Sequence, residues 1–224
     1  MKVLLTGNKG FIGTNFEEKL TGLGHTVFVY DPKPIPVYEV PNVEGLDLVI
    51  HLGAQSSTTA SRVEATLDQN YDFSYKLLMA CNLAGVDMQY ASSASVYGHV
   101  SRWNCIAESY EPKPQNLYAW SKYLFDRLVM KSLPHLDIKV QGFRYFNVWG
   151  PHETSKYAQA SLFHKWIKLL DKGETFKLFE GSDNYYRDFI HVNDVFNLQL
   201  AMVDNPDSGI FNIGTGTSTS IEQL

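Results

Sequence analysis

Three glycines near the N-terminus constrain the fold of this chain more than any other feature. Gly7, Gly10 and Gly13 have the spacing GxxGxxG. They directly follow a short apolar run at residues 3–5 and precede a segment with the periodicity of a helix. In such a turn the first glycine permits the tight bend, the second lets the backbone approach a pyrophosphate, and the third lets helix and strand pack closely. The pattern therefore predicts a strand–turn–helix unit whose helix N-terminus binds the phosphates of a dinucleotide.

An acidic residue lies where the second strand is expected to end. Asp31 comes 18 residues after Gly13, and its carboxylate can accept hydrogen bonds from the ribose of an adenosine. Lys33 follows two residues later, and a cation beside Asp31 can pair with a 2′-phosphate. The sequence therefore predicts either NAD or NADP as the cofactor and leaves both open.

Apolar runs alternate with helical segments along most of the chain. The expected strands are residues 26–30, 47–52, 88–91, 138–146 and 210–213, and the expected helices are 66–81, 118–130, 160–170 and a segment after residue 192. This alternation predicts an α/β fold, a Rossmann-type doubly wound parallel sheet. We expect Asn193 or Asp194 to be the N-cap of the last helix, because either side chain can cap a helix N-terminus.

A serine, a tyrosine and a lysine form the candidate catalytic group. Tyr118 and Lys122 are four residues apart on an expected helix, so both lie on one face. A phenol has a pKa of about 10, and we expect the neighbouring ammonium and a cationic nicotinamide to lower it. Such a tyrosine can accept a proton from an alcohol while hydride leaves the same carbon. Ser93, at an expected strand end, could hydrogen-bond the same substrate oxygen.

Composition excludes several classes of protein. Lys and Arg number 19 against 24 Asp and Glu, so the net charge of −5 predicts no nucleic-acid partner. Cys81 and Cys105 are the only cysteines, which argues against a disulfide framework or a zinc site and fits a cytoplasmic protein with no metal. The sequence has no apolar run of about 18 residues, so we expect no membrane span, and the N-terminus does not resemble a signal peptide.

Five motifs occur in an order that is typical of one family. They are GxxGFIG at residues 7–13, SSASVYG at 92–98, YAWSK at 118–122, FRYFNVWGP at 143–151 and RDFIHVNDV at 187–195. Together they resemble the extended short-chain dehydrogenases/reductases, in particular the NAD(P)-dependent nucleotide-sugar epimerases and dehydratases. The resemblance implies a nucleotide-diphosphate sugar as the substrate.

Within this group the chain is most similar to the ADP-glyceromanno-heptose 6-epimerases, through residues 51–59, 142–151 and 177–182. That similarity implies epimerisation by transient oxidation. Hydride would pass from sugar C6 to the bound cofactor, the ketone would reorient, and hydride would return to its other face. Tyr118 would serve as acid and base on one face, and Lys156 matches the lysine that serves on the other. Lys156 can equally be read as a solvated loop lysine.

The resemblance also implies contacts of individual residues. The positions that match cofactor contacts are Gly10, Phe11, Ile12, Asp31, Leu52, Gly53, Ala54, Asn70, Lys122 and Val148. The positions that match sugar-nucleotide contacts are Asn147, Phe179, Glu180, Gly181, Ser182 and Arg187. Arg187 is suited to a diphosphate because its guanidinium presents several donors at once. His164 aligns near a substrate histidine, but it can equally pack beside Phe163.

Other activities of the group can be weighed on the same motifs. Sugar dehydratases carry an acidic pair after the serine motif, where this chain has Ala94 and Ser95. A UDP-hexose 4-epimerase remains an alternative, because its mechanism needs Tyr118 and Lys122 but no Lys156. A sugar-nucleotide reductase and a non-catalytic dinucleotide-binding module are two further alternatives.

The expected domains are a dinucleotide-binding domain and a partial substrate lobe. The first comprises residues 1–149 and 186–213, and the second comprises 150–185 and 214–224. Members of the family usually have a further strand and helix where this chain has only residues 32–46. We therefore expect an apolar face of the sheet to be exposed or covered by a partner chain, and a homo-oligomer is compatible with the sequence. Relatives also continue beyond the position of residue 224, so we expect the substrate lobe to be incomplete.

Overall fold

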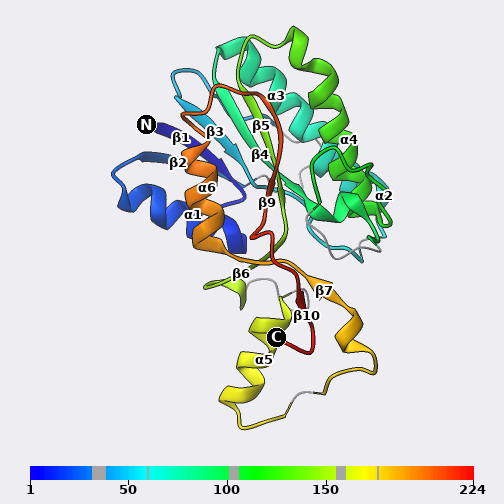
Figure 1. Ribbon diagram of the computed structural model, residues 1–224. Coiled ribbons are helices and arrows are strands. Elements are labelled where there is room, and N and C mark those ends of the chain that lie inside the picture. The colour runs from blue at the N-terminus through cyan, green and yellow to red at the C-terminus, as the bar shows by residue number, and fades with distance from the viewer. Residues whose placement is uncertain (32–38, 60, 101–105, 155–159, 176) are drawn as a thin grey trace.

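The computed structural model of the chain describes residues 1–31, 39–59, 61–100, 106–154, 160–175 and 177–224 (Figure 1). The strands are β1 (Lys2–Thr6), β2 (Thr26–Tyr30), β3 (Leu48–His51), β4 (Asp87–Ser93), β5 (Val140–Tyr145), β6 (Asn147–Trp149), β7 (Tyr186–Arg187), β8 (Phe189–His191), β9 (Gly209–Ile213) and β10 (Thr219–Ser220). The helices are α1 (Phe11–Gly22), α2 (Val63–Leu67), α3 (Phe73–Ala84), α4 (Leu117–Ser132), α5 (Leu162–Asp171) and α6 (Val192–Ala201). A π-helical turn, η1 (Asp68–Asp72), joins α2 to α3, and short 3₁₀ turns are η2 (Ala94–Tyr97), η3 (Leu133–His135) and η5 (Ser182–Asn184).

The central sheet contains six strands in the order β2-β1-β3-β4-β5-β9, and every neighbouring pair is parallel. All residues of β3 and β5 are buried, as expected for strands covered on both faces. This topology confirms the predicted α/β, Rossmann-type fold.

Two hydrophobic clusters cover the two faces of the sheet. On one face α1 packs against α6, where the rings of Phe16 and Phe196 meet edge to face with centroids 5.1 Å apart. On the other face α3 and α4 contribute Phe73, Leu77 and Phe125 to a second cluster. Figure 1 shows the two helix layers on opposite sides of the strands. Helices therefore bury both faces of the sheet, and the loops that follow its strands project from its carboxyl edge.

The predicted start of the last helix is wrong. Helix α6 begins at Val192, and its N-cap is His191, whose Nδ1 accepts a hydrogen bond from the backbone N–H of Asn193 at 3.2 Å. An imidazole nitrogen provides the acceptor here because β8 ends directly at the helix, so the first turn is already formed at Asn193.

The outer strand β2 is less covered than the others. Phe28 and Val29 are each 47% exposed, and β2 pairs on one side only, with β1. The described part of the connection to β3, residues 39–47, contains neither helix nor strand. Val43 of this connection is nonetheless buried and packs with Tyr30 against the second cluster, so it covers part of that face.

The carboxyl edge of the sheet begins at the glycine turn between β1 and α1. Gly7 has a φ of +74°, and a Cβ on it would lie 2.6 Å from the backbone of Gly53. A Cβ on Gly13 would lie 2.1 Å from the carbonyl oxygen of Gly7. Only glycine allows both approaches, so the turn, the helix and the loop after β3 form one closely packed unit.

We predict that Gly13→Ala destabilises the chain, because the new methyl group meets backbone atoms that cannot move aside. The expected loss in free energy of unfolding is about 1–3 kcal/mol or more. Gly22→Ala is the matched control on the same helix, since a Cβ there meets nothing within 4 Å. We expect that control to stabilise by about 0.5–1 kcal/mol. Urea unfolding of both variants is the measurement, and an unchanged midpoint in Gly13→Ala would contradict the close packing.

Candidate active site

The predicted catalytic and cofactor residues gather at the carboxyl edge of the sheet. Because β1, β3, β4 and β5 are parallel, the segments that follow them all emerge at this edge. Open parallel sheets bind ligands at that place. A cavity of about 1350 Å³ lies there and reaches into the small lobe formed by α5, β7 and β10. The candidates that line it are Ser93, Tyr118, Asn147, Val148, Phe179 and Arg187.

Tyr118 and Ser93 face each other across the gap between α4 and the end of β4. Ser93 is the N-cap of η2, and its Oγ accepts hydrogen bonds from the N–H of Ser95 at 3.2 Å and from its hydroxyl at 2.9 Å. The Ser93 proton is thereby free to be donated to Tyr118. Burial raises the pKa of Tyr118, and the hydrogen bond with Ser93 lowers it by less. The chain's own groups therefore leave the pKa of Tyr118 above its usual value. The lowering expected from the ammonium together with a cationic nicotinamide stays a prediction.

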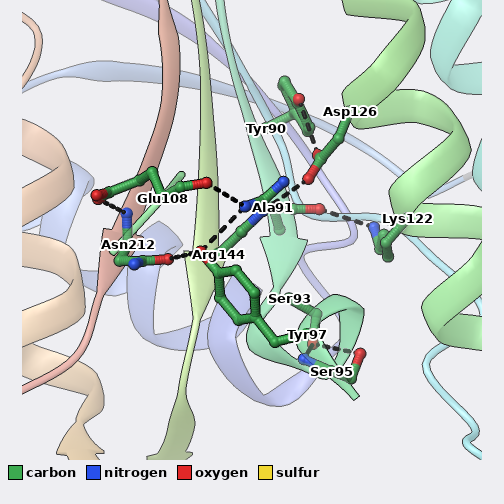
Figure 2. A network of polar contacts seen from close by, with 10 residues as sticks. All are labelled: Tyr90, Ala91, Ser93, Ser95, Tyr97, Glu108, Lys122, Asp126, Arg144 and Asn212. Carbon is green, nitrogen blue, oxygen red and sulfur yellow. Dashed lines mark hydrogen bonds and ion pairs between the residues drawn. The ribbon is translucent and has the colours of Figure 1, made fainter. Parts of the chain in front are cut away.

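Lys122 lies one helical turn after Tyr118 and is 5% exposed. Its Nζ donates a hydrogen bond to the carbonyl oxygen of Ala91 at 2.8 Å, as Figure 2 shows. Burial lowers the pKa of Lys122 and the carboxylate of Asp126 partly offsets this effect, so that the pKa is about 8. The ammonium is thus held between α4 and β4. Its pKa is close enough to neutral pH that the group loses its charge in mildly alkaline solution.

Asn70 links the cofactor side of the site to the helix that carries Tyr118. It lies in the π-helical turn η1, a feature that often occurs at functional sites. Its side-chain amide accepts from the N–H of Gln55 at 2.7 Å and donates to the Gln55 carbonyl at 3.0 Å and to Ser121 Oγ at 2.9 Å. Ser121 in turn donates to the carbonyl of Tyr118 at 2.7 Å. The sequence identified Asn70, but nothing in it indicated Ser121, which is 51 residues away.

A buried histidine at the end of β3 fixes the start of the loop that contains Gly53. His51 contacts Thr6 Oγ1 through Nδ1 at 2.6 Å and Ser74 Oγ through Nε2 at 2.8 Å. Thr6 Oγ1 also accepts the N–H of Gly53 at 3.1 Å. Burial, and to a smaller extent the charge of Lys122, lowers the pKa of His51 from 6.5 to about 3. His51 is therefore neutral and structural, a role that the sequence did not reveal.

The end of β2 carries the predicted ribose ligand. Asp31 Oδ2 forms an ion pair with Lys9 Nζ at 3.4 Å, and the lysine side chain is 66% exposed. Lys9 belongs to the glycine turn, between Gly7 and Gly10, and the sequence interpretation overlooked it. Its place inside the turn was the signal that could have found it. Lys33 lies outside the described residues.

The lobe side of the cavity is formed by β6, the end of β7 and the segment before η5. Asn147 donates through its backbone and its side chain to the carbonyl of Asp188, each at 3.0 Å. Arg187 is exposed, and its guanidinium donates to the carbonyl of Tyr186 at 2.7 Å. The rings of Phe179 and Tyr185 meet edge to face, and each is about half exposed. This wall therefore combines exposed aromatic rings with a guanidinium.

Several predicted substrate residues do not reach the cavity. Glu180, Gly181, Ser182 and His164 are absent from its described lining. His164 is instead 3.3 Å from Thr154 Oγ1 through its Nε2, near the start of α5. Lys156 lies outside the described residues.

With this geometry in place, comparison with known proteins identifies the family. Residues 3–214 match the NAD dependent epimerase/dehydratase family. The chain belongs to this family.

Solved structures of similar proteins include more than one kind of epimerase. The UDP-N-acetylglucosamine 4-epimerase of Methanobrevibacter ruminantium aligns with a TM-score of 0.89, over 100% of this chain and 79% of its own, at 24% identity. The ADP-L-glycero-D-manno-heptose-6-epimerase of Helicobacter pylori gives a TM-score of 0.85, over 99% and 79%, at 27% identity. The UDP-glucose 4-epimerase of Thermus thermophilus, in complex with NAD, gives 0.83, over 100% and 80%, also at 27%. Both a heptose epimerase and a hexose epimerase thus occur among the solved structures that are similar to this family member.

The family is NAD-dependent. Among the described residues, no group of three or more His, Cys, Asp or Glu side chains is placed to hold a metal ion. In the same part of the chain, no helix is both long and apolar enough to cross a membrane.

We predict that His51 makes this family member less stable as the pH falls below about 6.5. The unfolded chain binds a proton at His51 between pH 6.5 and about 3, and the folded chain does not. The free energy of unfolding therefore rises with pH through this window, by up to about 1.4 kcal/mol per pH unit. Urea unfolding at about pH 5, 6 and 7 should show a weaker pH dependence in His51→Gln than in the wild type. His135→Gln, at an exposed histidine, is the control and should follow the wild type.

Proposed function

We propose that this chain is an NAD(P)-dependent nucleotide-sugar epimerase that works by transient hydride transfer, most like ADP-glyceromanno-heptose 6-epimerase. The observation that carries the proposal is the meeting of Ser93, Tyr118 and Lys122 beside the large cavity at the carboxyl edge. A cavity of this size admits a sugar nucleotide. Its second wall provides the aromatic rings and the guanidinium that such a ligand requires.

The residues of the glycine turn fit a dinucleotide. Gly10 is the N-cap of α1 and has no side chain to cap the helix, and a Cβ on it would meet only the Gly7 carbonyl, at 3.3 Å. The N–H groups at the start of α1 are thus approachable by a pyrophosphate. We place the phosphates against Gly10, Phe11 and Ile12, and the adenosine ribose against Asp31. The remaining contacts are proposed for Gly7, Gly13, Lys33, Leu52, Gly53, Ala54, Asn70, Lys122 and Val148.

The reaction requires a proton acceptor at the oxygen of the oxidised carbon. A nicotinamide cofactor bound at the glycine turn would supply the hydride acceptor and donor. On one face of the sugar, Tyr118 takes the hydroxyl proton when the carbon is oxidised to a ketone and supplies a proton when the ketone is reduced. Ser93 donates a hydrogen bond to the same oxygen, and the positive charge of Lys122 stabilises the Tyr118 phenolate. We propose Lys156 as the second acid and base on the opposite face of the sugar.

Binding of the sugar nucleotide is proposed for the lobe. Asn147 and Ser93 would hold the sugar, and Arg187 would bind the diphosphate. Phe179, which lines the cavity, is a further proposed contact. His164, Glu180, Gly181 and Ser182 are also proposed, and they would have to reach the ligand from outside the described lining. We divide the chain into a dinucleotide domain of residues 1–149 and 186–213 and a substrate lobe of 150–185 and 214–224. The antiparallel pairing of β7 with β10 joins Tyr186 and Arg187 to the lobe and so favours a boundary two residues later, at Asp188.

A UDP-hexose 4-epimerase is the second candidate. It is favoured by the similarity to the Thermus thermophilus enzyme and by a mechanism that needs Tyr118 and Lys122 without Lys156. A net sugar-nucleotide reductase and a non-catalytic binding module differ from both in their use of cofactor.

The test is to incubate the purified chain with ADP-heptose and UDP-hexose and to follow product epimers by NMR. Denaturing the protein first and identifying the released nucleotide distinguishes NAD from NADP. An epimer without net oxidation of NAD(P)H supports the proposal, and the sugar that reacts selects between the two epimerases. Stoichiometric consumption of NAD(P)H indicates a reductase. Bound cofactor without turnover of any sugar indicates a binding module.

We predict that Tyr118→Phe lowers turnover by at least about a thousandfold, because the ring keeps its packing but loses the proton acceptor. Cofactor binding should be preserved, as measured by fluorescence titration. Tyr123→Phe removes a hydroxyl from the same helix and is the control with expected wild-type turnover. Epimerisation that survives in Tyr118→Phe would refute this mechanism.

We predict that Arg187→Ala raises KM for the sugar nucleotide about 10- to 100-fold with little change in kcat. A guanidinium that binds the diphosphate contributes equally to ground and transition states, so its loss affects KM. Arg127→Ala, on α4, is the control and should leave both constants unchanged. A change confined to kcat would exclude the diphosphate role of Arg187.

A further inference from the structure

An ion pair is buried directly behind the proposed catalytic group. Arg144 Nε donates to Asp126 Oδ2 at 2.9 Å, and the two residues are 5% and 1% exposed. Asp126 lies on α4 one turn after Lys122 and two turns after Tyr118, so all three share a helix face. Arg144 comes from the neighbouring strand β5. The pair therefore connects the helix of the proposed catalytic residues to the centre of the sheet.

Arg144 also binds the segment that follows Ser93. Its Nη1 donates to the hydroxyl of Tyr97 at 3.0 Å and to the carbonyl of Glu108 at 3.4 Å. Its guanidinium lies over the Tyr97 ring, 4.9 Å from the centroid. Tyr97 then donates to Asn212 Oδ1 at 2.7 Å (Figure 2). One guanidinium thus joins α4, β5, η2 and β9.

This network holds both halves of the catalytic group. Ser93 caps η2, the turn that carries Tyr97, and Ser93 pairs with Tyr145, the neighbour of Arg144, in the β4–β5 register. Lys122 is bonded to Ala91 of the same strand end. Movement of Arg144 would therefore shift the proposed hydrogen-bond donor relative to the helix that carries the proposed base.

Stability alone is a weak reason for such a pair. Two buried charges lose about as much solvation energy as they gain from attraction, so apolar residues of similar size often serve equally well. A charge at this position has an effect that an apolar residue cannot have, because it acts on Lys122. Two titratable groups interact directly with the charge of Lys122, namely Asp126 of α4 and His51 of β3, and Tyr118 lies one turn before it on α4. Tyr90 of β4 and Arg144 of β5 contact Asp126, and Tyr145 of β5 interacts with Tyr118.

Resting on the proposed function, we propose that Asp126, anchored by Arg144, is a positioning residue that keeps Lys122 charged and aligned with Tyr118. Burial alone lowers the pKa of Lys122, and the Asp126 carboxylate is the group that raises it, leaving it at about 8. Burial raises the pKa of Asp126 itself, and Arg144 opposes this change by stabilising the carboxylate. Without Asp126 the pKa of Lys122 falls toward neutral pH, where the ammonium needed by Tyr118 is lost.

The deciding experiment measures the titration midpoint of Lys122 in the absence of substrate. Lysine labelled with ¹³C at Cε is titrated by NMR in the full chain, and the Lys122 signal is assigned with Lys122→Arg. We expect Asp126→Asn to lower the Lys122 midpoint by about one pH unit or more. Tyr90→Phe is the matched control, because it removes the 3.0 Å hydrogen bond to Asp126 and leaves the carboxylate in place. An unchanged midpoint in Asp126→Asn overturns the proposal.

Two further variants protect this test from a failure to fold. Asp126→Asn leaves Arg144 buried without a counter-charge, which can be strongly destabilising. The double variant Asp126→Asn/Arg144→Met removes both charges and should show a fall in the Lys122 midpoint as well. Asp126→Glu keeps the charge and should restore the wild-type midpoint. A double variant that folds and titrates like the wild type also overturns the proposal.

The pH profile of turnover separates positioning from a merely structural role. The charged form of Lys122 is lost as pH rises through its pKa, so a lower pKa moves the alkaline limb of kcat to lower pH. A fall of about one pH unit from about 8 reduces the charged fraction at pH 8 from about one half to about one tenth, a loss of about fivefold in kcat. A uniform loss at every pH would refute the positioning role. If no sugar is turned over, the proposed function fails, while the NMR midpoint still decides the charge effect of Asp126.

Discussion

The backbone contact between the glycine turn and the loop after β3 is the constraint on which the rest of the site depends. A carbon added to Gly13 would lie 2.1 Å from the Gly7 carbonyl, and one added to Gly7 would lie 2.6 Å from Gly53. Thr6 ties the same two segments by accepting the Gly53 N–H. The start of α1 and the end of β3 are therefore fixed relative to each other, and the phosphate and nicotinamide ends of a dinucleotide would meet surfaces of fixed spacing.

Helix α4 positions the proposed catalytic residues relative to the loop after β3. Three successive turns place Tyr118, Lys122 and Asp126 on one face, and the Asn70 amide joins the helix to the loop after β3 through Ser121. Local helix geometry sets the spacing within the group, and long-range hydrogen bonds set its position against the sheet. The cofactor loop and the proposed base consequently belong to one hydrogen-bonded unit.

The sequence predicted those features that depend on local pattern. The glycine spacing and the four-residue interval of Tyr118 and Lys122 each specify geometry within one or two turns of chain, so the parallel sheet and the shared helix face followed from them. The ion pair of Asp126 with Arg144 and the cap of α6 by His191 depend on which segments meet in space, and no spacing encodes that. The raised pKa of Tyr118 likewise reflects burial by distant segments, so its direction could not be read from its helical neighbours alone.

Asp188 has a mechanical consequence for the cavity. The chain passes between the sheet and the lobe three times, and hydrogen bonds at Asp188 join all three passages: Asn147 donates to its carbonyl, and Thr215 donates to its carboxylate at 2.9 Å. The N–H of Phe146 is also bonded to the carbonyl of Ile213 at 3.0 Å. Three unconnected linkers would allow the sheet and the lobe to move relative to each other, whereas linkers joined by hydrogen bonds oppose such movement. These hydrogen bonds therefore restrict the movement of the two cavity walls relative to each other.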